Sequence, residues 1–227
     1  MPLRKVPLVT GEIYHVFNRG IDGRSIFTDE SEYRRALISL WLGSFRSCSH
    51  SPSQFCALSE EERAKVKDRL RTDQAKLVDV LTYCLMPNHF HFQLRQGCDG
   101  GISRYMANFQ NSITRFRNTR HKRVGQLLLT QFKAVRNETN EQFVHVNRYI
   151  HLNPHTGGVI KDVNDLKKYQ WSSLREYLEL TAKENKLCDG NLIISQFKNI
   201  DAYWSFVADH ADYQKSLKEI EKLTLDL

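Results

Sequence analysis

Alternating apolar and polar side chains mark three β-strands in the first half of the chain. Residues 12–20 alternate, are rich in β-formers and end in an Arg-Gly pair. Residues 77–86 are almost continuously apolar, which is typical of a buried strand. Residues 89–95 alternate again after a Pro-Asn turn, so we expect an antiparallel hairpin with the preceding strand.

Helical periodicity accounts for the segments between and after these strands. The first helix follows a cap at Asp29 or Ser31, the second covers about 102–118 and the third about 137–152. Residues 126–135 lie between the last two helices and look extended. The resulting order of elements predicts an α+β domain, in which helices cover one or both faces of an antiparallel sheet.

Charge is distributed unevenly along the chain. The net charge is +7, but residues 176–227 hold 6 basic against 10 acidic residues, so the first 175 residues carry the whole positive excess. The segment from Arg95 to Arg136 contains nine basic residues and one acid, Asp99. Such a concentrated positive field attracts a polyanion, although it is also compatible with a solubilising surface.

Several functional classes lack their sequence signatures. No apolar run is long enough for a bilayer span, and no signal peptide is evident. The five cysteines are scattered, which favours a reducing, cytoplasmic setting over a disulfide framework. The phosphate-binding loop, the H-E-x-x-H helix and the nucleophile-elbow serine are missing, so we expect no dependence on nucleotide triphosphates.

His89 and His91 are the first candidates for chemistry. One residue separates them, so on a strand both imidazoles share a face while the adjacent phenylalanines point into the core. Two imidazoles on a rigid strand form a good metal-binding pair. The alternatives are two surface histidines, or a structural zinc completed by Cys84 and Cys98, which lack the usual C-x-x-C spacing.

Tyr149 and Asn153 are the second candidates. They lie four residues apart on the third predicted helix and therefore share a face. Tyr149 offers a phenol and Asn153 a neutral carbonyl oxygen that could complete a metal site. A helical tyrosine is also common in a packed core. His145 and His151 lie nearby, and neither is assigned as a ligand.

Together these residues resemble the single-tyrosine HUH transposases, and within them the REP-associated tyrosine transposases. Four segments carry the resemblance, in the order YHVFNRGIDGRSIF, YCLMPNHFHFQL, RVGQLLLTQFKA and RYIHLNP. YQWSSLREYL also resembles the segment that commonly follows the domain. The resemblance extends over 11–178. We therefore expect a transposase-like domain over 1–178, with 44–76 as an insertion, and a helical acidic extension over 179–227.

The resemblance implies a ferredoxin-like α+β fold with the two histidines on a central strand. It also implies that His89 and His91, with Asn153 in a position often taken by glutamine, bind Mg²⁺ or Mn²⁺. Tyr149 matches the nucleophile that forms a 5′-phosphotyrosine when single-stranded or hairpin DNA is nicked and rejoined. An arginine expected near Gln131 is missing. A cytoplasmic, nucleoid-associated prokaryotic protein is implied, with a monomer favoured over a homodimer.

Basic residues in the second predicted helix and in the segment that follows it are candidates for phosphate contacts, with a solvated surface as the alternative. They are Arg104, Arg115, Arg117, Arg120, Lys122, Arg123, Lys133 and Arg136. Two other functions stay open. One is a domesticated, non-catalytic protein that binds hairpins, and the other is an RNA-binding module, because ferredoxin-like sheets often bind RNA.

Overall fold

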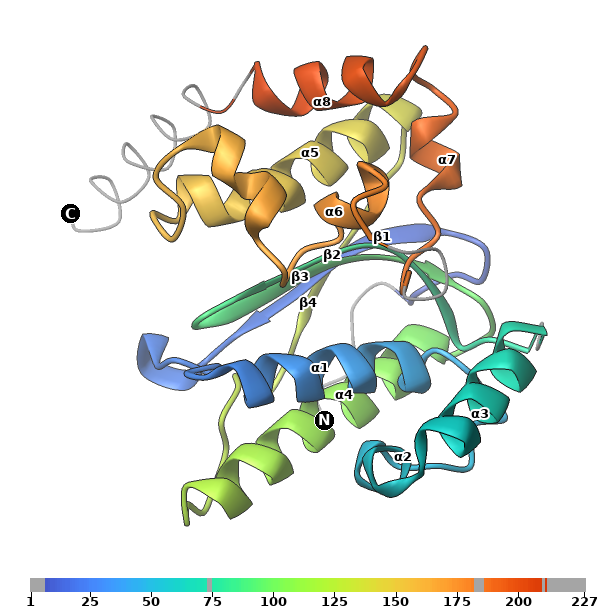
Figure 1. The fold of residues 1–227 in the computed structure, drawn as a ribbon, viewed down its shortest axis with the longest axis vertical. Helices are drawn as coiled ribbons and strands as arrows, with labels where there is room; N and C mark the ends of the chain where they lie inside the picture. The colour runs from blue at the N-terminus through green and yellow to red at the C-terminus, as the bar shows by residue number, and fades with distance from the viewer. Residues whose placement is uncertain (1–6, 73–74, 182–185, 210, 212–227) are drawn as a thin grey trace.

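A four-stranded antiparallel sheet forms the centre of the computed structural model, which describes residues 7–72, 75–181, 186–209 and 211. Its order is β2-β3-β1-β4. The strands are β1 (Ile13–Arg19), β2 (Val78–Met86), β3 (His89–Gln96) and β4 (Lys133–Arg136). This order and the alternation with helices confirm the predicted ferredoxin-like α+β fold (Figure 1).

Helices cover both faces of the sheet. One face carries α1 (Glu30–Gly43) and α4 (Gly101–Arg120), and the other carries α5 (Asn140–Thr156), α6 (Leu174–Tyr177) and α8 (Ile200–Ala208) (Figure 1). The shorter elements are η1 (Ile21–Gly23), α2 (Pro52–Ala57), α3 (Glu60–Thr72), η2 (Val163–Lys168) and α7 (Asn191–Ile194). No helix in the described part of the chain is long and apolar enough to cross a membrane.

The pleat of β3 separates a core face from a polar face. Phe90 and Phe92 are fully buried, and their rings meet Phe109 of α4 edge-on at centroid distances of 5.1 and 5.0 Å. The intervening residues, His89 and His91, therefore point to the face that α5 covers. Aromatic packing on one face thus fixes which side of the sheet presents the histidines.

The predicted cap of the first helix is confirmed, but both ends of the third predicted helix differ from the prediction, since α5 starts at Asn140 after a cap at Thr139 rather than at 137. Asp29 caps α1 by accepting hydrogen bonds from the backbone amides of Ser31 and Glu32. The prediction that the third helix ends before Pro154 is wrong, because α5 runs on to Thr156. A proline removes only its own amide donor, and in the last turn of a helix that loss interrupts little.

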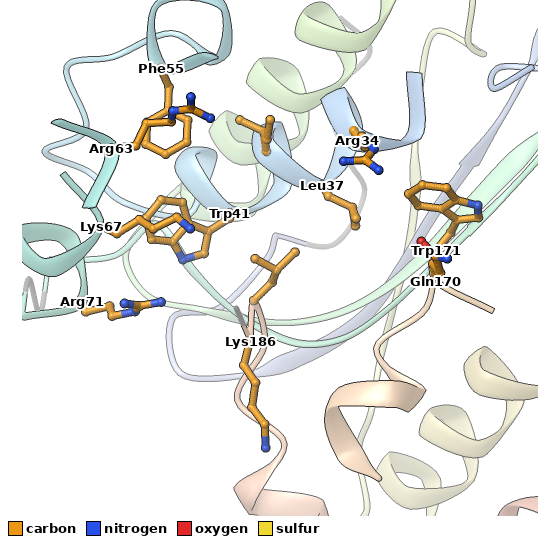
Figure 2. A pocket seen from close by; sticks show the side chains of 12 residues that line it. Arg34, Leu37, Trp41, Phe55, Arg63, Lys67, Arg71, Gln170, Trp171 and Lys186 are labelled. Carbon is orange, nitrogen blue, oxygen red and sulfur yellow. The ribbon is translucent and has the colours of Figure 1, made fainter. Parts of the chain in front are cut away.

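The 44–76 segment folds against α1 rather than forming a loose loop. Phe55 of α2 and Leu70 of α3 are buried with Trp41 of α1 in a separate apolar cluster. A capping box opens α3, since Ser59 and Glu62 exchange side-chain to backbone hydrogen bonds. A pocket lies where α1 and α3 approach the segment around Trp171 (Figure 2).

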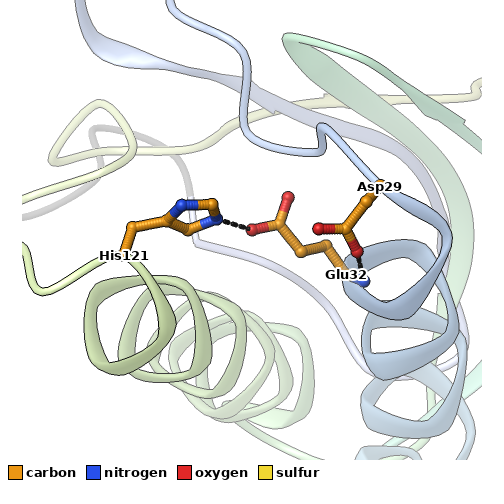
Figure 3. A group of neighbouring side chains, drawn as sticks. All are labelled: Asp29, Glu32 and His121. Atoms are coloured by element: carbon orange, nitrogen blue, oxygen red, sulfur yellow. Dashed lines mark hydrogen bonds and ion pairs between the residues drawn. The ribbon is translucent and has the colours of Figure 1, made fainter.

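A buried ion pair joins α1 to α4. Glu32, 2% exposed, accepts a hydrogen bond of 2.5 Å from Arg117, whose side chain is 11% exposed. The other carboxylate oxygen lies 2.7 Å from Nε2 of His121 (Figure 3). Thr28 donates to the same carboxylate through both its amide and its hydroxyl. The carboxylate is therefore almost fully coordinated by protein donors.

We expect Glu32→Gln to lower the free energy of unfolding by about 3 kcal/mol, because it leaves the Arg117 cation buried without its counter-ion. Urea denaturation at neutral pH measures this. Glu30→Gln is the matched control: Glu30 pairs with Arg34 at 2.6 Å on the same helix, but both side chains are exposed. That change should cost less than about 1 kcal/mol, and equal losses would contradict the buried-pair account.

Candidate metal and nucleophile site

Strand pairing gathers imidazoles on the face of the sheet beneath α5. In the antiparallel register of β1 and β3, Phe17 lies opposite His91 and His15 lies opposite Gln93. The rings of His15 and His91 stack with centroids 5.1 Å apart, and His89 meets His91 edge-on at 5.1 Å. Three histidines from two strands therefore form one cluster, of which the sequence predicted two.

Tyr149 approaches this cluster from α5. Its ring lies edge-on to His91 with a centroid distance of 5.5 Å, and edge-on to His15 at 5.8 Å. The structure therefore brings the candidate nucleophile to the candidate metal-binding pair, although they are far apart in the chain. Asn153 is completely buried one turn further along α5, where its amide nitrogen donates to the carbonyl of Tyr149 at 2.9 Å.

Hydrogen bonds to the Nδ1 atoms orient both histidines. Nδ1 of His89 lies 2.6 Å from Oδ1 of Asn88, and Nδ1 of His91 lies 2.9 Å from Nε2 of His15. An amide oxygen only accepts, so His89 carries its proton on Nδ1 and its lone pair on Nε2. If Nε2 of His15 is the acceptor, His91 likewise carries its proton on Nδ1 and its lone pair on Nε2. Both tautomers fit metal coordination through Nε2, which supports the donor chemistry expected of a metal site.

The zinc alternative does not fit this arrangement. Cys84 lies beside His91 in the register of β2 and β3, but Cys98 packs against the core on the other face of the sheet. The described residues therefore do not gather the four side chains of such a site. The other candidate cluster consists of Asp29, Glu32 and His121, whose ligand atoms lie within 4.8 Å of one another (Figure 3).

We interpret that second cluster as an ion-pair network rather than a metal centre. Arg117 already pairs with Glu32, and Arg120 pairs with Asp29 at 3.1 Å. Two guanidinium groups neutralise both carboxylates, so a divalent cation would have to displace them. Arg117 and Arg120 are therefore engaged within the protein and lie outside the DNA surface proposed below.

Of the remaining basic candidates, some lie away from the histidines and one lies beside them on the sheet. Arg136 pairs with Glu12 at 2.8 Å, and exposed Arg104 and Arg115 lie on α4, on the face of the sheet away from the histidines. Exposed Lys133 of β4 lies opposite Phe17, in the same cross-strand row as His91. Lys122 and Arg123 precede β4, in the loop that follows α4.

Arg19 was missed by the sequence analysis. It is exposed, and it lies directly opposite His89 in the register of β1 and β3. It makes no ion pair with the described residues. The sequence could have indicated its face, because Arg19 alternates with His15 and Phe17 and so lies on the same side of the strand. Only the pairing of β1 with β3 places it beside His89.

A buried polar network fixes α5 on the sheet. Imidazole atoms of His151 lie 2.6 Å from the hydroxyl of Tyr203 and 2.7 Å from that of Ser173. Tyr203 also donates to Asn147, which donates to Thr82 of β2. Burial lowers the pKa of His151 to about 3 and that of His15 to about 4, so both imidazoles are neutral at physiological pH.

The chain resembles a known protein in its fold. No family model matches the chain, and no curated protein matches it. Among solved structures, it resembles a REP-associated tyrosine transposase bound to a REP hairpin, with a TM-score of 0.52 and 14% sequence identity. The alignment covers 84% of this chain and 93% of that one. The fold is that of a REP-associated tyrosine transposase.

This likeness extends over most of both chains. At 14% identity it confirms the expected fold and shows the fold alone. The assignment of individual residues to chemical roles therefore rests on the geometry of the histidine and tyrosine cluster in this chain.

We expect the His151 environment to make stability dependent on pH. The pKa of His151 is about 3 when folded and about 6.5 when unfolded, so the unfolded chain binds more protons as the pH falls below about 6.5. The resulting loss of stability reaches up to about 2 kcal/mol at pH 5. Urea denaturation at pH 7.5 and at pH 5 measures the free energy of unfolding. The decrease between the two pH values should be smaller for His151→Gln than for the wild type, and an equal decrease would contradict this account.

Proposed function

We propose that this protein nicks and rejoins single-stranded DNA beside hairpins, through a covalent bond between Tyr149 and a 5′ phosphate. The supporting observation is the position of the Tyr149 ring, 5.5 Å from that of His91, on the fold of a hairpin-bound transposase. The cluster is built from a single chain, which favours a monomer that acts on its own.

His89, His91 and Asn153 are the residues proposed to hold a divalent cation, Mg²⁺ or Mn²⁺. When bound, such a cation supplies Lewis-acid polarisation of the scissile phosphate. Two neutral imidazoles and an amide oxygen leave its positive charge uncompensated, which suits a phosphate ligand. Imidazole ligands favour Mn²⁺ over Mg²⁺.

Tyr149 supplies the nucleophile. Its phenol oxygen attacks the phosphorus and loses its proton to solvent, the bond from phosphorus to the 3′ oxygen breaks, and that oxygen takes up a proton. The products are a 5′-phosphotyrosine and a free 3′ hydroxyl. The reverse attack by a 3′ hydroxyl restores the phosphodiester. No bond energy is lost in the exchange, which agrees with the missing nucleotide-binding motif.

Arg19, Lys133, Lys122 and Arg123 are the cations proposed to contact phosphates near this site. Arg19 and Lys133 lie in the same cross-strand rows as the two histidines. The helices α5, α6 and α8 cover the histidine face, whereas an RNA-recognition sheet stacks bases on exposed aromatic residues. The arrangement therefore favours a nuclease over an RNA-binding module.

His15 is proposed as a positioning residue. Its Nε2 lies 2.9 Å from Nδ1 of His91, so it holds that ring in the tautomer and orientation needed for coordination through Nε2. This role is distinct from catalysis, because it is exerted through another side chain.

We expect a metal-dependent covalent adduct when the protein meets labelled hairpin DNA with single-stranded flanks. Denaturing gels should show it with Mn²⁺, but not with EDTA or with the variants Tyr149→Phe and His89→Ala/His91→Ala. Tyr105→Phe is the matched control, since its hydroxyl bonds to Leu40 on the other side of the sheet. Hairpin binding without any adduct would favour the non-catalytic alternative.

Replacing His15 should weaken metal binding about 10- to 100-fold. Isothermal titration with Mn²⁺ measures this without any reaction. His15→Gln should retain much of the affinity because its amide oxygen can accept from His91, whereas His15→Phe should not. Hairpin binding in EDTA should be the same for all three proteins. Equal Mn²⁺ affinity in His15→Phe and the wild type would remove the positioning role.

A further inference from the structure

A pocket of about 580 Å³ lies between α1, α3 and the segment around Trp171 (Figure 2). Helix α1 forms one wall, the α2–α3 segment forms a second, and residues 170–171 with 186–187 form the third. Its size is within the range of about 300–1,000 Å³ that is typical of ligand sites. We call it the α1–α3 pocket.

The α1–α3 pocket is lined by five cations and by no acidic residue. These are Arg34, Arg63, Lys67, Arg71 and Lys186. Lys67 and Lys186 make no ion pair with the described part of the chain, and the pair of Arg34 with Glu30 is exposed to solvent. Such an excess of one sign in a concave site raises the local concentration of anions.

Aromatic side chains are interleaved with these cations. Trp41, Phe55 and Trp171 line the same pocket. Trp171 stacks on Tyr33 with centroids 4.7 Å apart and planes 15° from parallel, which holds its indole in place. Fixed aromatic rings beside a row of cations are the features with which proteins hold unpaired bases and their phosphates.

The pocket is separate from the proposed chemistry. It opens between α1 and α3, whereas His91 lies on the other face of the sheet, where Tyr149 reaches it from α5. None of its lining residues belongs to the histidine and tyrosine cluster. Two of its walls come from α1 and the 44–76 segment, whose role the proposed reaction does not explain.

We propose that the α1–α3 pocket is a second nucleic-acid site, which binds an unpaired stretch of single-stranded DNA. Bases stack against Trp171, which is partly exposed, and phosphates contact Lys67, Arg71 and Lys186. A bare anion would use the cations but not the rings, so the interleaved aromatic side chains favour a nucleic-acid strand. Binding here needs neither the metal nor Tyr149.

The test compares two variants of the full chain that remove the same charge from the same helix. Lys67→Gln/Arg71→Gln alters the pocket, and Lys65→Gln/Arg69→Gln alters α3 outside it. Binding of labelled oligothymidylate is measured in EDTA, so that cleavage cannot contribute. We expect roughly tenfold weaker binding for the pocket variant, a change within about twofold for the control, and a salt slope reduced by about 1.4 for two lost phosphate contacts.

Tryptophan fluorescence provides a second readout. In a Trp204→Phe background the two remaining tryptophans both line the pocket. Oligothymidylate should quench them, and inorganic polyphosphate should neither quench them to the same extent nor bind as tightly. The proposal would be overturned if oligothymidylate binding were weakened equally in the two α3 variants or in neither. It would also be overturned if polyphosphate quenched the tryptophans as strongly, and bound as tightly, as oligothymidylate. Melting temperatures by circular dichroism establish that each variant is folded.

Discussion

The antiparallel pairing of β1 with β3 is the constraint on which the site depends. It sets Phe17 against His91, His15 against Gln93 and Arg19 against His89. Side chains alternate between the two faces of the sheet. If β3 slipped by one residue, His89 and His91 would point into the aromatic core, and Phe90 and Phe92 would point to the opposite face. The packing of Phe90 and Phe92 on Phe109 therefore protects the chemistry on the opposite face.

The position of α5 is the second constraint. The nucleophile lies on a helix, so its distance from the histidines depends on how that helix sits on the sheet. Apolar packing alone tolerates small slides, whereas the hydrogen bonds of Asn147 to Thr82 and of His151 to Ser173 require one register. Gln93 adds a hydrogen bond to the carbonyl of Phe143, at the start of the same helix. These polar contacts explain why α5 carries buried amides and an imidazole where apolar residues would also fit.

The sequence was sufficient for features that depend on local spacing. The face shared by His89 and His91, the cap at Asp29 and the helical pattern of α4 follow from residues a few positions apart. His15 and Arg19 were missed because their roles arise only when β1 is paired with β3 in register. The ion pair of Glu32 with Arg117 was missed for the same reason, since it requires α1 to pack on α4. Pro154 was misread because a proline near the end of a helix and one just beyond it look alike in sequence.

Charge spacing on α3 bears on why the α1–α3 pocket exists. Arg63, Lys67 and Arg71 follow one another at intervals of four, which stacks like charges along one side of the helix. Such repulsion costs a few tenths of a kcal/mol per pair, and anchoring through Leu70 alone would not require it. Three acidic residues of α3 lie in its first turn, and the fourth, Asp68, pairs with Arg71 at 3.6 Å but does not line the pocket. The three cations of α3 face the wall of the pocket that contains Trp171. A polyanion bound in the pocket would neutralise them, so their mutual repulsion lowers stability only while the pocket is empty.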